Sequence, residues 1–274
     1  MTPNLIVPGA PKSGTSSLHE YLNLHPDIEM SRVKEPHFFT HNKIYQEGLD
    51  FYKKMFLNPQ IKYHGESSTA YFSDQLALKR IQKDVKDVKF ILILRNPVER
   101  TISHYRWLVS HFQEFRSFRR SIEYNIDHPV DHRKTTLSGN YKNYFITSLY
   151  GQHINRMANR IGKENIHIIT TRELYSDTNN AMNSCFSFLG LSEYEINHKI
   201  ISNKTRPLLS NWMSFKWFVG EFVKKGVIDL RYILYILSYK AGKIDQNDKI
   251  WLESLYQDDL QLLKEYCPDI EERW

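Results

Sequence analysis

The amino-acid sequence predicts an α/β fold in which helices flank a central parallel sheet. Two observations lead to this prediction: four short apolar runs are typical of buried strands, and segments with helical signals lie between them. Strands that alternate with helices form parallel sheets with right-handed crossovers, and ligands bind at the carboxyl ends of such strands. A chain of 274 residues can bury one substantial core, although length alone also allows two. We expect a single domain over residues 1–274.

The clearest predicted strand is VKFILIL, residues 88–94, because an unbroken apolar run suits a central strand that is covered on both faces. The other three predicted strands are NLIVP, IKYHGES and NIHIITT, at residues 4–8, 61–67 and 165–171. Helices are expected at residues 16–25, after the central strand, and through residues 179–191. Asn96 can cap the second helix and Pro97 can occupy its first position, while Gly190 can end the third.

The composition limits the class of protein. Apolar residues make up 41% and charged residues 25% of the chain, which describes a folded globular protein. The net charge of +6 favours anionic partners, which include nucleotides, sulfated or phosphorylated glycans, nucleic acid and acidic lipid headgroups. Because the basic residues are spread along the chain, we expect no nucleic-acid partner.

The part from about residue 205 to residue 274 is predicted to be helical and rich in aromatic residues. Charged side chains interrupt its most apolar segment, residues 211–239, so no stretch reaches the roughly 20 apolar residues that cross a bilayer. Buried helices are the favoured interpretation, and a helix on a membrane surface is the alternative.

The N-terminus and the cysteines bear on the cellular compartment. No basic segment followed by a long apolar stretch opens the chain, which predicts a cytoplasmic protein without a secretory signal. Cys185 lies in an apolar run and is expected in the core, and a single disulfide bond between Cys185 and Cys267 stays open.

The stretch PGAPKSGTSS, residues 8–17, is similar to a Walker A phosphate-binding loop with a displaced lysine. Gly9 and Gly14 keep the spacing of that motif, but Thr15 stands at the lysine position and Lys12 comes three residues earlier. A glycine turn between a strand and a helix presents backbone N–H groups at the helix N-terminus, where a phosphate binds. The predicted donors of backbone N–H or hydroxyl groups are Ser13, Gly14, Thr15, Ser16 and Ser17.

A second candidate site follows the central strand, in LRNPVERTISHY at residues 94–105. Arg95 lies at the predicted strand end, and Ser103 lies eight residues later in the next helix. A guanidinium group and a hydroxyl group there can converge on a phosphate, which arginine suits through its forked and permanent charge. Taken alone, the two residues fit a surface arginine and an ordinary helical serine equally well.

Three motifs, PKSGTSS, ILILRNPVERTISHY and KEPHFF, together resemble the sulfotransferase superfamily that uses 3′-phosphoadenosine 5′-phosphosulfate (PAPS). The resemblance is to the branch of heparan sulfate sulfotransferases. Looser matches are GLDFYKKMF, GNYKNYFITSL and NKTRP, at residues 48–56, 139–149 and 203–207. The resemblance implies a P-loop-containing nucleotide hydrolase-like fold, PAPS as sulfuryl donor, adenosine 3′,5′-bisphosphate (PAP) as product, and no required metal.

The resemblance also assigns roles to residues. Lys12 would contact the oxygen that bridges phosphorus and sulfur, where negative charge builds as the bond breaks. Arg95 and Ser103 would hold the 3′-phosphate, which distinguishes PAPS from ATP. A loop that closes over the nucleotide, or else a basic surface turn, would contain Lys204, Thr205 and Arg206.

The acceptor must lose a proton, and KEPHFF offers the group that takes it. Glu35 falls at the position of the proposed base in heparan-type enzymes. In an extended segment His37 would share the face of Glu35 and act as an acceptor contact or auxiliary. The alternative is a surface pair of Lys34 and Glu35 beside a buried HFF.

The stretch ESSTAYF, residues 66–72, departs from the pattern E-K-S-P-x-Y-F of heparan-type enzymes: Ser67 stands at the lysine and Thr69 at the proline. A missing lysine removes one contact to the acceptor or the sulfuryl group. The departure argues against a highly anionic glycosaminoglycan acceptor, unless other lysines compensate. Tyr71 and Phe72 could stack on a sugar ring or fill the core.

The predicted function is transfer of the sulfuryl group of PAPS to a hydroxyl of a saccharide, either a glycan or a glycolipid. The expected acceptor cleft is formed by KEPHFF, residues 127–140 and the C-terminal helices. One alternative is a lipid or another small-molecule acceptor. Two further alternatives are a magnesium-dependent P-loop kinase, which needs a lysine next to Gly14, and a non-catalytic anion-binding protein.

Overall fold

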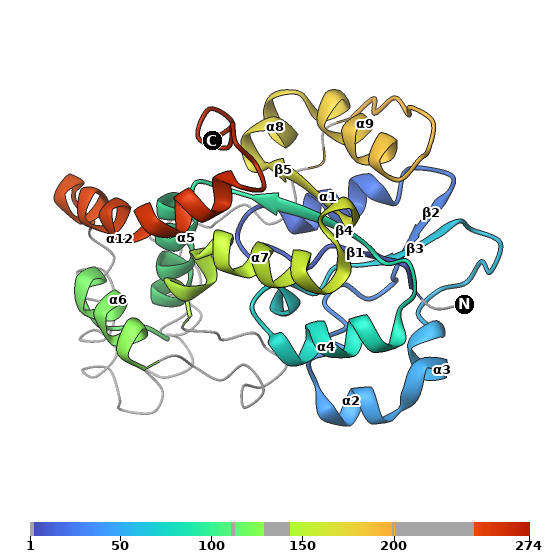
Figure 1. Cartoon of the computed structure of the whole chain (residues 1–274), viewed down its shortest axis with the longest axis horizontal. Helices are drawn as coiled ribbons and strands as arrows, with labels where there is room; N and C mark the ends of the chain where they lie inside the picture. Colours follow the sequence, from blue (N-terminus) through green and yellow to red (C-terminus); the bar gives the residue numbers. More distant parts are fainter. Residues whose placement is uncertain (1–2, 111–112, 129–142, 199, 201–243) are drawn as a thin grey trace, which may run out of the picture.

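A five-stranded parallel sheet lies at the centre of the computed structural model, which describes residues 3–110, 113–128, 143–198, 200 and 244–274 (Figure 1). The strand order is β2-β3-β1-β4-β5. The strands are β1 (Leu5–Ile6), β2 (Ile28–Met30), β3 (Tyr63–Glu66), β4 (Lys89–Leu94) and β5 (Ile166–Thr170). All four strand pairs are parallel, so the carboxyl ends of the strands meet at one edge and the α/β prediction is confirmed.

Helices connect and cover the strands (Figure 1). The α-helices of the described residues are α1 (Thr15–Leu22), α2 (Asn42–Gln46), α3 (Gly48–Lys53), α4 (Gln75–Asp84), α5 (Pro97–Ser110), α6 (Phe118–Asp127), α7 (Tyr150–Ile161), α8 (Thr171–Ser176), α9 (Thr178–Phe188) and α12 (Gln246–Lys264). Short 3₁₀ helices are η1 (Thr69–Phe72), η3 (Ile146–Ser148) and η4 (Lys163–Asn165).

The central strand β4 is buried on both faces, as its unbroken apolar run predicts. Successive side chains of a strand point to opposite faces. Phe90, Leu92 and Leu94 therefore pack with α4, α7 and the end of α12. Ile91 and Ile93 pack with α1 and α9 on the other face. The helices on both faces hold the sheet in place, and the site lies at the edge formed by the carboxyl ends of the strands.

The predicted strands all form, and the caps of two helices are as expected. Asn96 Oδ1 accepts hydrogen bonds from the amides of Val98 and Glu99 at 3.0 and 3.2 Å, with Pro97 as the first residue of α5. Gly190 has a φ of 62° directly after α9 and its C-cap. The helix predicted at residues 16–25 is shorter, because α1 ends at Leu22.

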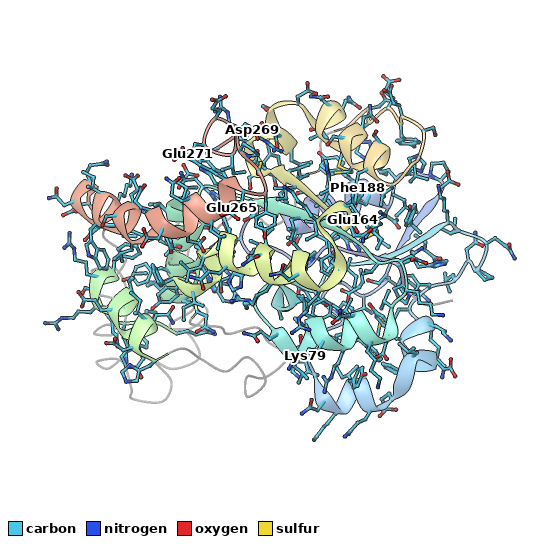
Figure 2. All side chains as sticks on the ribbon, viewed as in Figure 1. Lys79, Glu164, Phe188, Glu265, Asp269 and Glu271 are labelled. Carbon is cyan, nitrogen blue, oxygen red and sulfur yellow. The ribbon has the colours of Figure 1, made fainter. Side chains whose placement is uncertain are left out.

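The C-terminal residues return from the end of α12 towards β5, as Figure 2 shows through the positions of Glu265, Asp269 and Glu271. Arg273 donates a hydrogen bond of 2.8 Å to the carbonyl of Ile168 in β5 and pairs with Glu173 of α8 at 2.8 Å. The C-terminal residues thus cover part of the outer edge of the sheet. Among the described residues, no helix combines the length and the apolar character that a membrane crossing requires.

Helix α7 packs against α12 with almost no space at Gly151. A Cβ atom there would lie 2.4 Å from the carbonyl oxygen of Asp259 and 2.8 Å from the backbone nitrogen of Leu263. The Asp259 carboxylate also accepts hydrogen bonds from the amides of Gly151 and Gln152, at 2.8 and 3.0 Å. The contact is therefore between two backbones, which cannot yield as a flexible side chain does.

We expect Gly151→Ala to lower the free energy of unfolding by about 1–3 kcal/mol, because it overpacks this helix contact. Urea-induced unfolding followed by circular dichroism measures the change. A glycine-to-alanine change in an uncrowded helix is instead stabilising by about 0.5–1 kcal/mol. A variant that gains stability would show that α7 and α12 do not pack as described.

Candidate active site

The glycine loop leaves β1 and stays attached to β4. The amide of Ala10 donates to the carbonyl of Ile93 at 2.9 Å, and the amide of Ile93 donates to the carbonyl of Gly9 at 3.0 Å. A Cβ atom at Gly9 would lie 2.8 Å from the Cβ of Phe72, so the loop position excludes a side chain. Gly14 is the N-cap of α1 with a φ of 101°, a conformation that favours glycine. The predicted order of strand, loop and helix is confirmed.

The first turn of α1 suits an anionic group. It contains no acidic residue, and no side chain caps it. Ser13, Thr15 and Ser17 are buried, while Gly14 and Ser16 are half-buried. The Ser17 hydroxyl lies 3.1 Å from the hydroxyl of Tyr175, and Thr171 donates a hydrogen bond of 2.7 Å to the carbonyl of Ser13. Helix α8 therefore contacts both the loop and the first turn of α1, and the positive N-terminal end of α1 can bind an anion.

Lys12 is held in an uncommon backbone conformation, with a φ of 69°. Its Nζ lies 5.4 Å from the centroid of the Trp107 ring, a cation–π contact with helix α5. Burial, together with the positive charges of Arg100 and Arg95, lowers the pKa of Lys12 to about 8. A lysine in these surroundings gains most from a nearby anion, which would offset both its burial and the repulsion.

Arg95 follows β4, as predicted, and is exposed enough to meet a ligand. Its Nε and Nη2 both lie 2.9 Å from Oε2 of Glu99. Such exposed pairs contribute little to stability, so a phosphate can join or replace Glu99 at small cost. Ser103 is half-buried in α5, and Trp107, four residues later, shares its helix face. That Arg95 and Ser103 hold a common phosphate stays a prediction.

Arg100 is a buried cation that sequence reasoning missed. Its side chain is fully buried, and its described partners are neutral: Ser148 Oγ at 2.6 Å, His104 Nδ1 at 3.3 Å and the carbonyl of Tyr144. Because an arginine stays charged in proteins, the side chain adds a fixed positive charge to the region of Lys12. Lys12, Arg95 and Arg100 thus form a positively charged region, and this set of groups fits an anionic nucleotide.

Glu35 and His37 lie together, but the segment between them is not extended as predicted. Both residues have a left-handed backbone, with φ values of 58° and 54°, so they turn towards each other within a tight loop. His37 Nε2 lies 3.6 Å from Glu35 Oε2. Burial lowers the pKa of His37, and the Glu35 charge opposes that effect. The imidazole beside the predicted base is therefore neutral near pH 7.

The predicted alternative for this segment is also present. Lys34 Nζ lies 2.9 Å from Glu35 Oε1, and the two side chains are about 29% and 27% exposed. Phe38 and Phe39 are fully buried. Lys34 and Glu35 thus form a partly exposed pair beside a buried HFF. The Glu35 carboxylate of that pair is still exposed enough for an acceptor to reach it.

The stretch ESSTAYF lies directly against KEPHFF, which the sequence did not predict. The amide of Glu35 donates to the carbonyl of Ser67 at 3.1 Å, and the amide of His37 donates to Ser68 Oγ at 3.0 Å. Tyr71 and Phe72 are buried and fill the core, so they do not stack on a sugar ring. Hydrogen bonds thus join the two segments at the end of β3.

Glu66, the last residue of β3, is a fully buried carboxylic acid. Its Oε1 accepts a hydrogen bond of 2.9 Å from Tyr52. Burial, with a further contribution from the charge of Glu35, raises the pKa of Glu66 to about 7 from an ordinary value of 4.5. The folded protein therefore binds a proton between these values that the unfolded chain has lost. In that window the contribution of Glu66 to stability falls as the pH rises, by roughly 3 kcal/mol in total.

We expect Glu66→Gln to remove this pH dependence, because glutamine does not ionise. The free energy of unfolding of the variant, relative to the wild type, should increase between pH 4.5 and pH 7 and stay constant above that range. Urea titrations at both ends of the window measure the difference. A constant difference across the window would show that Glu66 ionises as an ordinary carboxylate.

Several predicted parts lie outside the described residues or apart from the site. Lys204, Thr205 and Arg206 lie outside them, as do most of residues 127–140 and the C-terminal part up to residue 243. Cys185 and Cys267 are both buried and free, so they do not form the disulfide bond that the sequence left open. A pocket of about 510 Å³ lies along β5 and is lined by none of the predicted site residues.

A glycine loop at a helix N-terminus and a carboxylate at one edge of a parallel sheet are typical of enzymes that transfer a group from an anionic donor. A sequence model of the sulfotransferase domain matches residues 2–226, and the chain belongs to the sulfotransferase family. The resemblance drawn from the motifs is thereby confirmed for the family and the fold.

The similarity extends to named relatives. Over 207 residues, or 74% of its length, the chain is 30% identical to human (Homo sapiens) heparan sulfate glucosamine 3-O-sulfotransferase 6, and it spans 57% of that protein. The membrane-associated sulfotransferase kil1 of Dictyostelium discoideum is 35% identical over 133 residues, 47% of this chain and 27% of that protein. A sulfotransferase structure from Alicyclobacillus acidocaldarius superposes with a TM-score of 0.62 at 27% identity, over 82% of this chain and 94% of the other.

Proposed function

We propose that the protein transfers the sulfuryl group of PAPS to an acceptor hydroxyl by in-line displacement and releases PAP. One observation carries the proposal furthest. Four non-glycine residues of the described chain have a left-handed backbone, and three of them are Lys12, Glu35 and His37. Backbone strain of this kind concentrates at functional sites, where the surrounding structure holds it in place. The same three residues are those that the motifs assign to catalysis.

The basic residues have separate tasks in this scheme. PAPS supplies an electrophilic sulfur and a bisphosphate leaving group. Lys12 stabilises the charge that develops on the bridging oxygen, and the loop amides of residues 13–17 hold the 5′-phosphate. Arg95 and Ser103 hold the 3′-phosphate. Arg100 adds a fixed positive charge and itself stays within the core.

Glu35 takes the proton of the acceptor hydroxyl as its oxygen attacks sulfur. The carboxylate is partly exposed, and it is oriented by contacts on both of its oxygens. His37 lies beside it as a neutral imidazole, which can receive a hydrogen bond from the acceptor or from protonated Glu35. No step of this scheme needs a metal ion. Closure of residues Lys204, Thr205 and Arg206 over the nucleotide stays a prediction, as does a cytoplasmic location.

The acceptor is proposed to be a saccharide hydroxyl, on a glycan or a glycolipid. The support is the relationship to 3-O-sulfotransferases that act on heparan sulfate glucosamine, at 30% identity. Ser67 in place of a lysine favours a saccharide with less negative charge than heparan sulfate. A panel of neutral oligosaccharides, heparan oligosaccharides, lipids and phenols, assayed with labelled PAPS, tests this class. Sulfation of lipids or phenols alone would overturn the saccharide assignment.

A further inference from the structure

Thr69 contacts both oxygens of the Glu35 carboxylate. Its backbone amide donates a hydrogen bond of 2.9 Å to Oε2. Its hydroxyl lies 3.0 Å from Oε1 and 3.2 Å from Oε2. Hydrogen bonds to an ionised carboxylate are about twice as strong as those between neutral groups. A single residue therefore fixes the plane in which the carboxylate lies.

These contacts depend on the residue type at position 69. A proline, the residue of the heparan-type pattern, has neither an amide hydrogen nor a hydroxyl group to donate. The other departure from that pattern, Ser67, is fully buried, and its hydroxyl lies 2.9 Å from His19 Nδ1. The backbone carbonyl of Ser67 accepts a hydrogen bond of 3.1 Å from the amide of Glu35. Thr69 therefore makes contacts with Glu35 that proline could not make, while the bond from Ser67 to Glu35 comes from its backbone.

The remaining neighbours of Glu35 are less able to fix it. Lys34 reaches Oε1 from a flexible side chain that is 29% exposed. His37 Nε2 is 3.6 Å from Oε2, beyond an ordinary hydrogen bond. Thr69 instead opens the 3₁₀ helix η1, whose next three residues are buried. It is the rigid partner among the described contacts of this carboxylate.

We propose that Thr69 is a positioning residue for the base. The inference rests on the proposed function, because it requires Glu35 to be the base. Donors that hold a carboxylate in one orientation leave the same lone pair facing the acceptor in each turnover.

Three variants test the role through catalysis. Thr69→Val keeps the amide and removes the hydroxyl, and we expect kcat to fall roughly tenfold with an unchanged KM for PAPS. Thr69→Ser keeps both donors and should retain most activity. The matched control is Thr178→Val, which removes a half-buried hydroxyl that donates to the carbonyl of Leu174 at 2.9 Å, and we expect wild-type kinetics.

A fourth variant removes both donors at once. Thr69→Pro has neither the amide hydrogen nor the hydroxyl group, and it should lose more activity than Thr69→Val. Wild-type kcat in Thr69→Val would overturn the positioning role.

A measurement without turnover separates this inference from the proposed function. The amide proton of Thr69 should exchange slowly with solvent because it is bonded to Glu35, and Glu35→Ala should speed that exchange. An amide that exchanges equally fast in both proteins would overturn the inference, even in an active enzyme. A wild type that shows the slow exchange but transfers no sulfuryl group to any acceptor would instead count against the proposed function.

Discussion

Lys12→Met is expected to lower kcat by about 10²–10³-fold, the cost of removing one preorganised group from a developing negative charge. Methionine is similar in length and can keep the packing over Trp107, where Lys12 Nζ now lies 5.4 Å from the ring centroid. The lost quantity is therefore charge rather than shape. PAP should still bind, because the loop amides, Arg95 and Ser103 remain.

The matched control for this variant is Lys79→Met. Lys79 is an exposed residue of α4, as Figure 2 shows, and its loss should leave kcat unchanged. The wild-type profile provides a second check. Since burial and two arginines lower the pKa of Lys12 to about 8, the charged form is lost as the pH rises through that value. We expect kcat/KM to fall above pH 8 and to stay level there in Lys12→Arg. A Lys12→Met enzyme with wild-type kcat would remove Lys12 from the mechanism.

Glu35→Gln is expected to lower turnover by about 10²–10⁴-fold, the usual contribution of a general base. Glutamine keeps the size of the side chain and one oxygen for the Thr69 donors, but it cannot take a proton from the acceptor. Affinity for PAP, measured by calorimetry, should stay close to that of the wild type, because Glu35 belongs to the acceptor side.

Glu265→Gln is the matched control, an exposed carboxylate at the end of α12 (Figure 2). Its kinetics should equal those of the wild type. An active Glu35→Gln enzyme would contradict the assignment of the base and direct attention to His37, whose Nε2 lies 3.6 Å from the same carboxylate.

The sequence predicts the sheet well where the apolar pattern is strong. The run that becomes β4 is unbroken, so its burial on both faces follows from the sequence. Strand β2 was missed because it is only three residues long and contains Glu29. The Glu29 carboxylate accepts hydrogen bonds from the amides of Leu57 and Asn58, at 2.7 and 3.0 Å. Such a partner, distant in the sequence, gives no local signal.

The motifs predict the charged and hydroxyl-bearing residues that would contact the nucleotide, but they do not predict the residues packed around them. Arg100 stands within a quoted motif, yet arginines are almost never fully buried, so its place in the core could not be expected. The place of Trp107 near the site could have been predicted from the sequence, because it lies four residues after Ser103 on the same helix. The extended segment expected between Glu35 and His37 is wrong, because tertiary contacts with residues 67–69 impose the left-handed turns.

The most direct test of the account is the thermal stability of the purified protein with PAP and, separately, with ATP, in the presence of EDTA. A ligand that binds only the folded state stabilises it by about 2.7 kcal/mol at 100 times its Kd, which raises the Tm. We predict a clear increase with PAP, no requirement for metal, and little or no increase with ATP, which lacks the 3′-phosphate. An increase with ATP that depends on magnesium, without one for PAP, would contradict the sulfotransferase site and support the kinase alternative.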